Sequence, residues 1–500
     1  MDSKVTKIII VGGGSAGWMA ANSLLNQLNK NLDITLVESE TIGTIGVGEG
    51  STPYLKEYFR ALDIPESEWM PACNATYKTG INFVNWSTVN GYENYFHPFF
   101  SQFDLKPAQF FFNNCNKRRL QHNANAHPNH YFVAAHLASL NYSPIVKEKV
   151  PFDVDYGYHF DSVKLGLFLK RKAQEKNINH IISNITEVNK KDNGDISSIT
   201  TDCGKKIVGD FFIDCSGFAA LLVNKTQNRH FVSYADTLLN DSAVAIQTPL
   251  NSDEYAPPLT ISKALKYGWS WQIPLANRWG NGYVYSSQFI TPEDAEAELR
   301  EELGLTDTTI KAKHLKMRVG RLDEHWRGNC LAVGLSQGFI EPLEATALML
   351  IQLTIEKFIQ VNNQNTTPSI ENINTFNTEI NTTFDGIRDY ILAHYKLNTR
   401  SDTPYWRHCR ENINETPSLA TILNAWDSEL NFEDTLAKNK SQLVYLKPSW
   451  YCILAGMGRF PEVTQADYES NAQNASEYCK SIVELYFLKN KEQLNTLYKK

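Results

Sequence analysis

Three features are missing from this sequence of 500 residues. Its eight cysteines are scattered, none forms a C-x-x-C pair, and no cysteine–histidine cluster has the spacing of a zinc site, so neither a zinc-binding nor a disulfide-stapled protein is expected. No run of about 18 apolar residues is present to span a membrane. The formal net charge is −7, which argues against a nucleic-acid-binding protein because such proteins normally present a basic face.

The N-terminus also lacks the pattern of an export signal. The segment MDSKVTK passes directly into a strand-like run, so we predict no signal peptide and a reduced, cytoplasmic protein. With 42% hydrophobic and 21% charged residues the composition is that of an ordinary globular protein, but the chain is longer than one hydrophobic core usually supports. Two or three structural units are expected.

What is present begins with a dinucleotide-binding βαβ pattern. A β-branched run at 7–11 is followed by a glycine-rich turn, a helical stretch at 18–30 and a second strand candidate at 33–38. The turn satisfies G-x-G-x-x-G with Gly12, Gly14 and Gly17. Without side chains the turn can tighten and its N–H groups can approach a pyrophosphate. Glu38 ends the second strand, where a carboxylate binds ribose hydroxyls and disfavours a 2′-phosphate, which leaves FAD or NAD.

A second glycine-rich turn, TIGVGEGSTP at 44–53, carries Glu49. It is either a surface loop or a loop whose exposed N–H groups contact a large cofactor. FAD needs more such contacts than NAD does, so the second interpretation favours FAD.

Further strand candidates are dispersed along the chain. Short apolar runs at 211–217 and 330–334 end in glycine and are typical of a nucleotide-binding sheet. They are interleaved with a second sheet-rich unit, predicted around 75–150 and 230–320. From about 343 onward the pattern is helical, apart from the Asn-rich stretch at 361–382. We expect this stretch to be an exposed loop with polar helix ends.

The segment GWSWQIP places Trp269 and Trp271 two residues apart ahead of a proline. Alternate residues of a strand face the same side, so the two indoles on their own indicate packing in a core. Lys78, in ATYKTGINFVNW, has apolar neighbours. It either extends its amine to solvent or, if buried, loses its proton more readily and acts as a nucleophile or a hydrogen-bond donor.

The segment GLSQGFIEPLEATAL at 334–348 crosses glycines and enters a predicted helix near Pro342, a favoured first-turn residue. Such a helix start can stabilise negative charge, including a halide or a reduced flavin. Glu344 in its first turn is either a helix cap or a catalytic carboxylate, and the sequence pattern leaves both open.

Taken together, these segments resemble the flavin-dependent halogenases, the family typified by tryptophan halogenases. Residues 269–274 match the family's W-x-W-x-I-P element in full, and residues 46–53 match its second FAD loop. YKTGINFVNW resembles the segment of the essential lysine, and EPLEAT the family's EPLES run, with Ala345 where serine is common. Residues 394–406 and 449–461 also resemble family segments, so the likeness extends from residue 7 to about 461.

The resemblance implies an α/β fold with a Rossmann-like FAD-binding part of the flavin monooxygenase type, an interleaved substrate-binding sheet and a C-terminal helical region. The implied FAD-binding parts are 1–75, 151–230 and 321–360, with a substrate-side insertion at 76–150, a substrate-binding sheet at 231–320 and a helical substrate-pocket region at 361–500. The implied cofactor-binding residues are Gly12, Gly14, Ser15, Ala16, Gly17, Glu38, Gly46, Val47, Gly48, Glu49, Val188, Gly217, Leu335 and Leu348.

The resemblance also implies a two-component reaction. A separate flavin reductase supplies FADH2, which reacts with O2 to give a C4a-hydroperoxide, and halide attacks it to give hypohalous acid. The acid travels through a tunnel to Lys78, which holds the electrophile, while Glu344 tunes the lysine and removes a proton from the substrate. The backbone at Thr346 and Ala347 would bind halide, and a homodimer is expected from the family.

The paired tryptophans would then be a wall beside the flavin that keeps the organic substrate away from the hydroperoxide. For the substrate, His97 and Phe99 match one side of the family's aromatic sandwich, and Trp450 matches the other. Tyr445 replaces a pair of adjacent tyrosines, and Ser449 replaces a phenylalanine that helps grip free tryptophan. We therefore expect indole-like or other electron-rich aromatics rather than free tryptophan.

Two alternatives remain at the level of the sequence. A flavin monooxygenase that hydroxylates an aromatic compound would usually carry a Gly-Asp run where this chain has Gly334-Leu335-Ser336. A flavin-binding protein without turnover would be expected to lack Lys78 or Glu344, and both are present.

Overall fold

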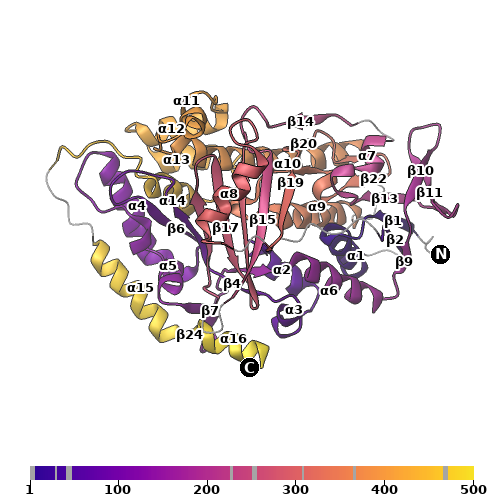
Figure 1. Cartoon of the computed structure of the whole chain (residues 1–500), viewed down its shortest axis with the longest axis horizontal. Coiled ribbons are helices and arrows are strands. Elements are labelled where there is room, and N and C mark those ends of the chain that lie inside the picture. The colour runs from indigo at the N-terminus through magenta and orange to yellow at the C-terminus, as the bar shows by residue number, and fades with distance from the viewer. Residues whose placement is uncertain are drawn as a thin grey trace.

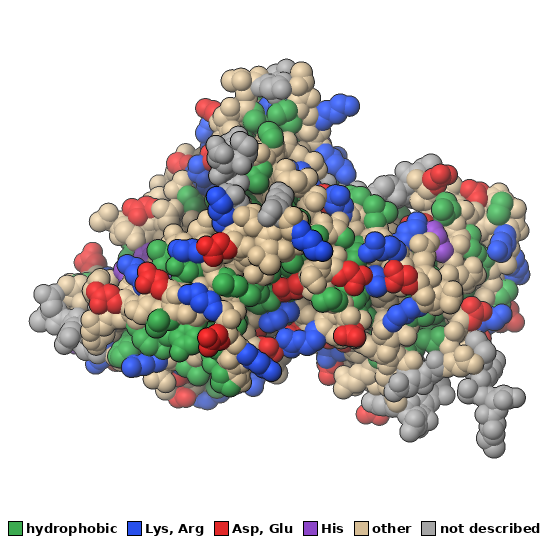
Figure 2. All heavy atoms as spheres, turned by 90° about the horizontal axis from the view of Figure 1, so that it is seen from below, with side chains coloured by type: hydrophobic (Ala, Val, Ile, Leu, Met, Phe, Trp, Pro, Cys, Tyr) green, Lys and Arg blue, Asp and Glu red, His purple; other side chains and the backbone are tan. Residues whose placement is uncertain are grey.

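The computed structural model describes residues 6–28, 31–40, 48–225, 229–250, 256–306, 309–363, 368–465 and 471–499. Figure 1 shows a nucleotide-type sheet at one end, next to the N-terminus, and a large second sheet at the centre. Figure 2 shows acidic and basic side chains interspersed on one face of the molecule.

The first sheet has six strands in the order β21-β22-β13-β1-β2-β9. Its strands are β1 (Thr6–Val11), β2 (Leu32–Glu38), β9 (Asn179–Ile182), β13 (Phe211–Asp214), β21 (Trp326–Arg327) and β22 (Cys330–Ala332). All pairings are parallel except that of β21 with β22. The helices α1 (Ser15–Gln27), α6 (Ser162–Gln174) and α9 (Ala347–Asn362) pack beside it, with α1 contacting the other two. The dispersed pieces of a nucleotide-binding sheet are therefore confirmed.

The second sheet has seven strands in the order β19-β15-β18-β17-β16-β5-β6. These are β5 (Gly80–Val84), β6 (Asn94–Pro98), β15 (Ser242–Pro249), β16 (Thr260–Ala264), β17 (Gly268–Pro274), β18 (Arg278–Tyr285) and β19 (Ala312–Lys316). The W-x-W segment forms β17, near the middle of this sheet. A small sheet of β3 (Glu49–Gly50), β8 (Gly157–Phe160) and β4 (Thr76–Lys78) carries the second glycine turn and Lys78 together.

Smaller elements complete the chain. The remaining strands are β7 (Tyr142–Val146), β10 (Ile185–Lys190), β11 (Ile196–Thr201), β12 (Lys206–Val208), β14 (Phe231–Ser233), β20 (Gly320–Leu322), β23 (Gly338–Phe339) and β24 (Phe487–Lys489). Besides α1, α6 and α9, the helices before the C-terminal part are α2 (Tyr54–Ala61), α3 (Glu66–Ala72), α4 (Leu105–Arg119), α5 (Val133–Ser139), α7 (Leu221–Lys225) and α8 (Pro292–Glu302).

The C-terminal part is mainly helical. It consists of α10 (Ile370–Leu397), α11 (Pro404–Glu411), α12 (Pro417–Asp427), α13 (Phe432–Lys438), α14 (Lys447–Gly456), α15 (Ala472–Tyr486) and α16 (Asn490–Tyr498), with β24 between the last two. In Figure 1, α11 to α13 lie at the top left, and α15 and α16 run along the lower left edge.

The expectation of an exposed loop at 361–382 was wrong for residues 370–382, which are helical, and residues 364–367 lie outside the described residues. The long helix α10 begins at Ile370, where Ser369 and Asn372 form a capping box. Phe376, Ile380 and Phe384 recur at a spacing of four residues and are buried. One apolar stripe is enough to dock the helix although its other faces are rich in asparagine and threonine.

Candidate functional site

One cavity of about 920 Å³ connects the two glycine-rich turns with Lys78 and the paired tryptophans. Its volume lies at the upper end of the range for small-molecule and cofactor sites. It is lined by residues from both main sheets and from the start of α9, so it is an assembly of distant chain segments.

The first glycine turn lies at one end of this cavity. Gly14 precedes α1 and lines the cavity, and a Cβ built on it would meet no atom within 4 Å. A Cβ at Gly17 would instead lie 1.9 Å from the carbonyl oxygen of Gly12. Gly17 therefore allows close packing of helix on turn, and Gly14 leaves an open backbone cradle at a helix N-terminus, which fits a pyrophosphate. Ser15 and Ala16 line the same cradle.

Glu38 lies against this turn and also lines the cavity. Its Oε1 accepts a hydrogen bond from Lys170 Nζ at 2.8 Å and lies 2.8 Å from His180 Nε2. A Cβ at Gly13 would clash with the Glu38 carboxylate. The carboxylate is thus fixed beside the cradle, where a ribose of a bound dinucleotide would lie.

The other predicted FAD residues divide into three groups. The cavity is lined by Gly48, Glu49, Gly217, Leu335 and Leu348. Gly46 and Val47 lie outside the described residues. Val188 does not line the cavity: in the β10–β11 hairpin it pairs with Ile199 and packs on a separate apolar cluster, while Ile185 lines the cavity at the start of the same strand. Burial raises the pKa of Glu49 to about 7.

Lys78 lines the same cavity as the first glycine turn, stands at the end of β4 and is 1% exposed. Its Nζ is 5.5 Å from the centre of the Phe99 ring and would lie 3.3 Å from a Cβ on Gly50. Burial lowers the pKa of the amine to about 8, although the nearby Glu344 carboxylate raises it in part. The interpretation of an amine that extends to solvent is therefore excluded.

Glu344 lies in a 3-10 turn, Pro342–Glu344, and not in the first turn of α9 as we expected, because Ala345 adopts a left-handed conformation (φ 57°) and the helix starts at Ala347. Its Oε1 is 2.8 Å from His394 Nε2, and its Oε2 is 3.2 Å from His97 Nδ1. Burial alone would raise the pKa of Glu344, but the charge of His97 and the hydrogen bonds of both histidines outweigh it and lower the pKa to about 2.

The start of α9 follows at once. Ala347 lines the cavity, and Thr346 is buried as the residue that precedes the helix. The first N–H groups of any α-helix lack partners within the helix, so this position is suited to an anion.

The two tryptophans of β17 also line the cavity, with ring centres 6.2 Å apart. Trp271 lies against Gly282 of β18, where a Cβ would be 2.1 Å from the indole. Trp269 donates from Nε1 to Oε2 of Glu341 at 2.8 Å. Sequence reasoning missed Glu341, although it stands in the same EPLEAT run.

Three of the predicted substrate residues, His97, Tyr445 and Trp450, pack around Tyr390, whereas Phe99 lies near Lys78, and none of the four lines the cavity. Tyr390 stacks on Tyr445 with ring centres 3.6 Å apart and meets Trp450 edge-on at 4.9 Å. The Tyr390 hydroxyl is 3.3 Å from His97 Nε2 and donates to the Ser449 carbonyl. Sequence reasoning also missed Tyr390 and His394. Both lie in the segment 390–397 of α10, four residues apart, a spacing that could have suggested one face of a helix.

A family model described as tryptophan halogenase matches residues 7–473. The chain belongs to the tryptophan halogenase family. It is 35% identical over 447 residues to the tryptophan 6-halogenase of Streptomyces toxytricini, covering 85% of this chain and 84% of the relative. It is also 35% identical over 495 residues to the tryptophan 7-halogenase of Lentzea aerocolonigenes, covering 92% and 91%.

Solved structures agree with this assignment. The tryptophan 6-halogenase from Streptomyces toxytricini superimposes with a TM-score of 0.85 at 32% identity, covering 98% of this chain and 99% of that one. A flavin-dependent halogenase from Xanthomonas campestris gives a TM-score of 0.82 at 30% identity, covering 99% and 96%.

This tryptophan halogenase family member is thus an enzyme, a flavin-dependent halogenase, and its family membership implies FAD, halide and O2 as participants in the chemistry. The aromatic hydroxylase alternative is not favoured. Within the described ranges, no helix is long and apolar enough to cross a membrane. The same ranges contain no group of three or more His, Cys, Asp or Glu residues that could hold a metal ion.

Proposed function

We propose that this halogenase attaches a halogen to an electron-rich aromatic substrate such as indole or an indole derivative, with FADH2 provided by a separate flavin reductase. The observation that carries the proposal is the cavity that extends from the glycine turn to the buried amine of Lys78. Bound reduced FAD and O2 supply the oxidant that converts halide to hypohalous acid. The start of α9, at Thr346 and Ala347, is the proposed place for the halide.

Lys78 receives the hypohalous acid. With a pKa of about 8, its ammonium and amine forms are both populated near neutral pH. The ammonium form donates a hydrogen bond to the oxygen of the acid, whereas the amine form takes the halogen as a haloamine, and the site is compatible with either. In both cases the electrophile is fixed beside the arene, which lowers the entropic barrier and sets the regiochemistry.

Glu344 supplies the base. Its two histidine partners keep the carboxylate ionised, so it can stabilise the cationic arene and accept its proton. In the hydrogen-bonded route the oxygen–halogen bond breaks, the carbon–halogen bond forms, and the arene proton passes to Glu344. The departing hydroxide takes a proton from the Lys78 ammonium and leaves as water.

The substrate class follows from the aromatic residues around His97. Phe99, beside the Lys78 amine, has a ring that suits stacking with a planar, electron-rich compound, while Trp450 and Tyr445 pack on Tyr390 outside the lining of the cavity. Ser449 stands where a gripping phenylalanine is expected, so the amino-acid part of free tryptophan gains less there. Cytoplasmic location and a homodimer remain predictions from the sequence.

Mass spectrometry of products tests the function directly. The protein is supplied with FAD, NADH and a flavin reductase, and indole, tryptophan and a phenol are offered with chloride, bromide or iodide in separate reactions. We expect the mass shift of one halogen, with indole ahead of tryptophan. Oxygen insertion without halogen would contradict the halogenase assignment, and a preference for free tryptophan would contradict the substrate class.

A further inference from the structure

Glu341 is a buried carboxylate to which the chemistry above gives no role. It is 1% exposed, and a single oxygen, Oε2, accepts three hydrogen bonds, from Trp269 Nε1 at 2.8 Å, Tyr395 Oη at 2.7 Å and Asn240 Nδ2 at 3.0 Å. Among the described residues, the other oxygen, Oε1, has no partner. A buried polar atom without a partner costs stability, so a packing role alone would be served better by an apolar side chain.

The two tryptophans of β17 are fixed in different ways. Trp271 is fixed by shape, because its indole lies on the bare backbone of Gly282. Trp269 instead uses its ring nitrogen, and the partner of that nitrogen is Glu341. An indole has two side-chain torsions, so a hydrogen bond from its single N–H donor helps to select the orientation of the ring.

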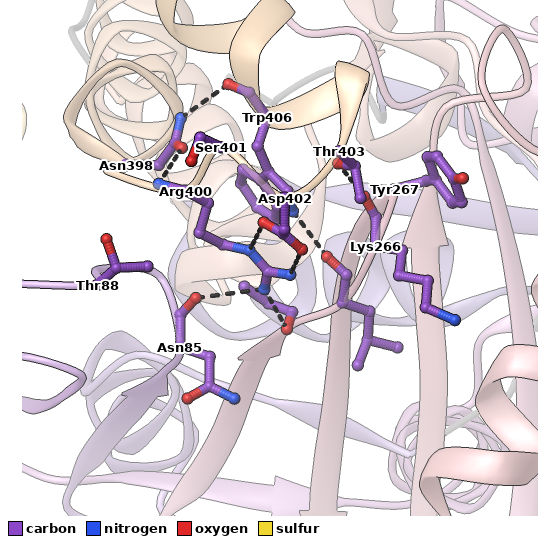
Figure 3. A network of polar contacts seen from close by, with 12 residues as sticks. Asn85, Thr88, Lys266, Tyr267, Asn398, Arg400, Ser401, Asp402, Thr403 and Trp406 are labelled. Atoms are coloured by element: carbon purple, nitrogen blue, oxygen red, sulfur yellow. Dashed lines mark hydrogen bonds and ion pairs between the residues drawn. The ribbon is translucent and has the colours of Figure 1, made fainter.

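The backbone ahead of Trp269 is fixed separately, by the loop that follows α10. Two side chains of this loop and one of the following helix α11 donate to three consecutive carbonyl groups, those of residues 264, 265 and 266 (Figure 3). The donors are Arg400 at 2.8 Å, Trp406 at 2.7 Å and Thr403 at 2.7 Å. The turn between β16 and β17 is held in this way, and Glu341 accepts the hydrogen bond of the Trp269 ring.

Helix α10 also connects Glu341 with Glu344. Tyr395 donates to Glu341, and its neighbour His394 pairs with Glu344. Glu341 directly precedes the short turn Pro342–Glu344, and Glu344 ends it. Trp269 is therefore linked through Glu341 to Tyr395, and the proposed base Glu344 contacts the preceding residue of α10, His394.

We infer that Glu341 is a positioning residue, which orients the Trp269 indole as part of the cavity wall so that the oxidised halide is retained until it reaches Lys78. The inference rests on the proposed function, because it concerns how that function keeps its electrophile. Glu341 contacts neither substrate nor cofactor in this account and acts through Trp269.

The experiment compares Glu341→Ala with Glu341→Gln. Each variant is supplied with FAD, NADH, a flavin reductase, bromide and indole in air, and a freely diffusing β-diketone is added to trap escaped hypobromous acid. For Glu341→Ala we expect the ratio of brominated arene to brominated trap to fall about tenfold, because a displaced wall residue misplaces or releases the electrophile. Glu341→Gln keeps a carbonyl oxygen that accepts from Trp269 and Tyr395, so it should retain a ratio close to that of the wild type. KM for the arene should change little in either variant.

Glu66→Ala is the matched control. Glu66 also accepts hydrogen bonds from three aromatic side chains, Tyr77, Tyr156 and Tyr158, but none of these tyrosines lines the cavity, whereas the Glu341 partner Trp269 does. Its loss should lower thermal stability while the product ratio stays unchanged. An equal fall of the ratio in Glu66→Ala and Glu341→Ala would overturn the inference, because general loosening of the fold would then explain both.

Two further measurements separate the inference from the proposed function. The near-ultraviolet circular dichroism of the flavin-free protein should change in Glu341→Ala, because the Trp269–Trp271 pair changes its geometry, and should stay unchanged in Glu341→Gln. The double variant Trp269→Phe/Glu341→Ala should have a product ratio no lower than Trp269→Phe alone. Additive losses, or an unchanged spectrum, would overturn the role of Glu341. If the wild type brominated neither arene nor trap, the proposed function itself would fail, whatever the spectra show.

Discussion

The two ends of the cavity are built in different ways. The glycine-turn end uses the backbone of a few consecutive residues, 12–17, with one carboxylate, Glu38, from the next strand. The Lys78 end uses side chains brought together from remote segments, since His97 and Glu344 are 247 positions apart and Glu344 and His394 are 50 apart. The first end can bind a cofactor through local geometry alone, whereas the second acts only when the whole fold is in place.

The difference extends to electrostatics. At the glycine end the Glu38 carboxylate has the Lys170 ammonium and the His180 ring within hydrogen-bonding distance. At the other end Lys78 and Glu344 are both buried. The pKa of the lysine is lowered to about 8 and that of the carboxylate to about 2. Perturbed pKa values of this kind are typical of reacting groups.

The variant Lys78→Ala should have the largest effect and tests whether the two ends of the cavity act independently. We expect product formation to fall about 1,000-fold or more while FAD affinity stays unchanged, because only the Lys78 end loses a reacting group. Product mass spectrometry and flavin binding by fluorescence measure the two effects. Retained product would remove Lys78 from the reaction, and lost flavin binding would mean that the ends are not independent.

Glu344→Gln should lower the halogenation rate about 100-fold, because the amide keeps the shape of the side chain but cannot take the arene proton. His394→Gln is a useful companion variant. It removes the imidazole ring that contacts Glu344 but keeps a side chain that can donate a hydrogen bond. An unchanged rate in Glu344→Gln would reduce Glu344 to a structural residue of its turn.

Two glycine substitutions sharpen the description of the other end. Gly14→Ala should leave the thermal midpoint unchanged and weaken FAD binding about tenfold, because the new methyl group enters the open space that the pyrophosphate of FAD would occupy. Gly17→Ala should destabilise the protein itself by about 1–3 kcal/mol, because its methyl group meets the Gly12 carbonyl at 1.9 Å. Calorimetry with and without FAD distinguishes them, and equal effects on stability would contradict the assigned roles.

The smallest effect concerns the pH dependence of stability. The pKa of Lys78 falls from 10.5 in the unfolded chain to about 8 in the folded protein, so the unfolded chain binds more protons and wild-type stability rises with pH through this window. Lys78→Met removes this dependence. Its advantage in free energy of unfolding over the wild type should therefore shrink by about 1 kcal/mol between pH 7 and pH 9, as followed by urea denaturation. A constant difference would show that the amine is not desolvated.

The sequence predicted a large part of this architecture. Gly12, Gly14, Gly17 and Glu38 indicated a dinucleotide site because strand, turn and helix are encoded by neighbouring residues, and the family motifs added Lys78 and Glu344. Val188 and the Asn-rich stretch show where such reasoning ends. Val188 was predicted to bind the cofactor but packs on an apolar cluster apart from the cavity lining, and a helix with one narrow apolar stripe resembled a loop in its composition.

By itself the sequence therefore determined the local chemistry: two open glycine turns, a lysine among apolar residues, an EPLEAT turn and two indoles on one strand. Only the tertiary structure decided what those groups contact. It buried Lys78 and changed its pKa, paired Glu344 with His97 and His394, and bound Trp269 to Glu341 across 72 positions. The physical reason is that hydrogen bonds and desolvation depend on distances in space, and no periodicity along the chain specifies which distant segments will meet.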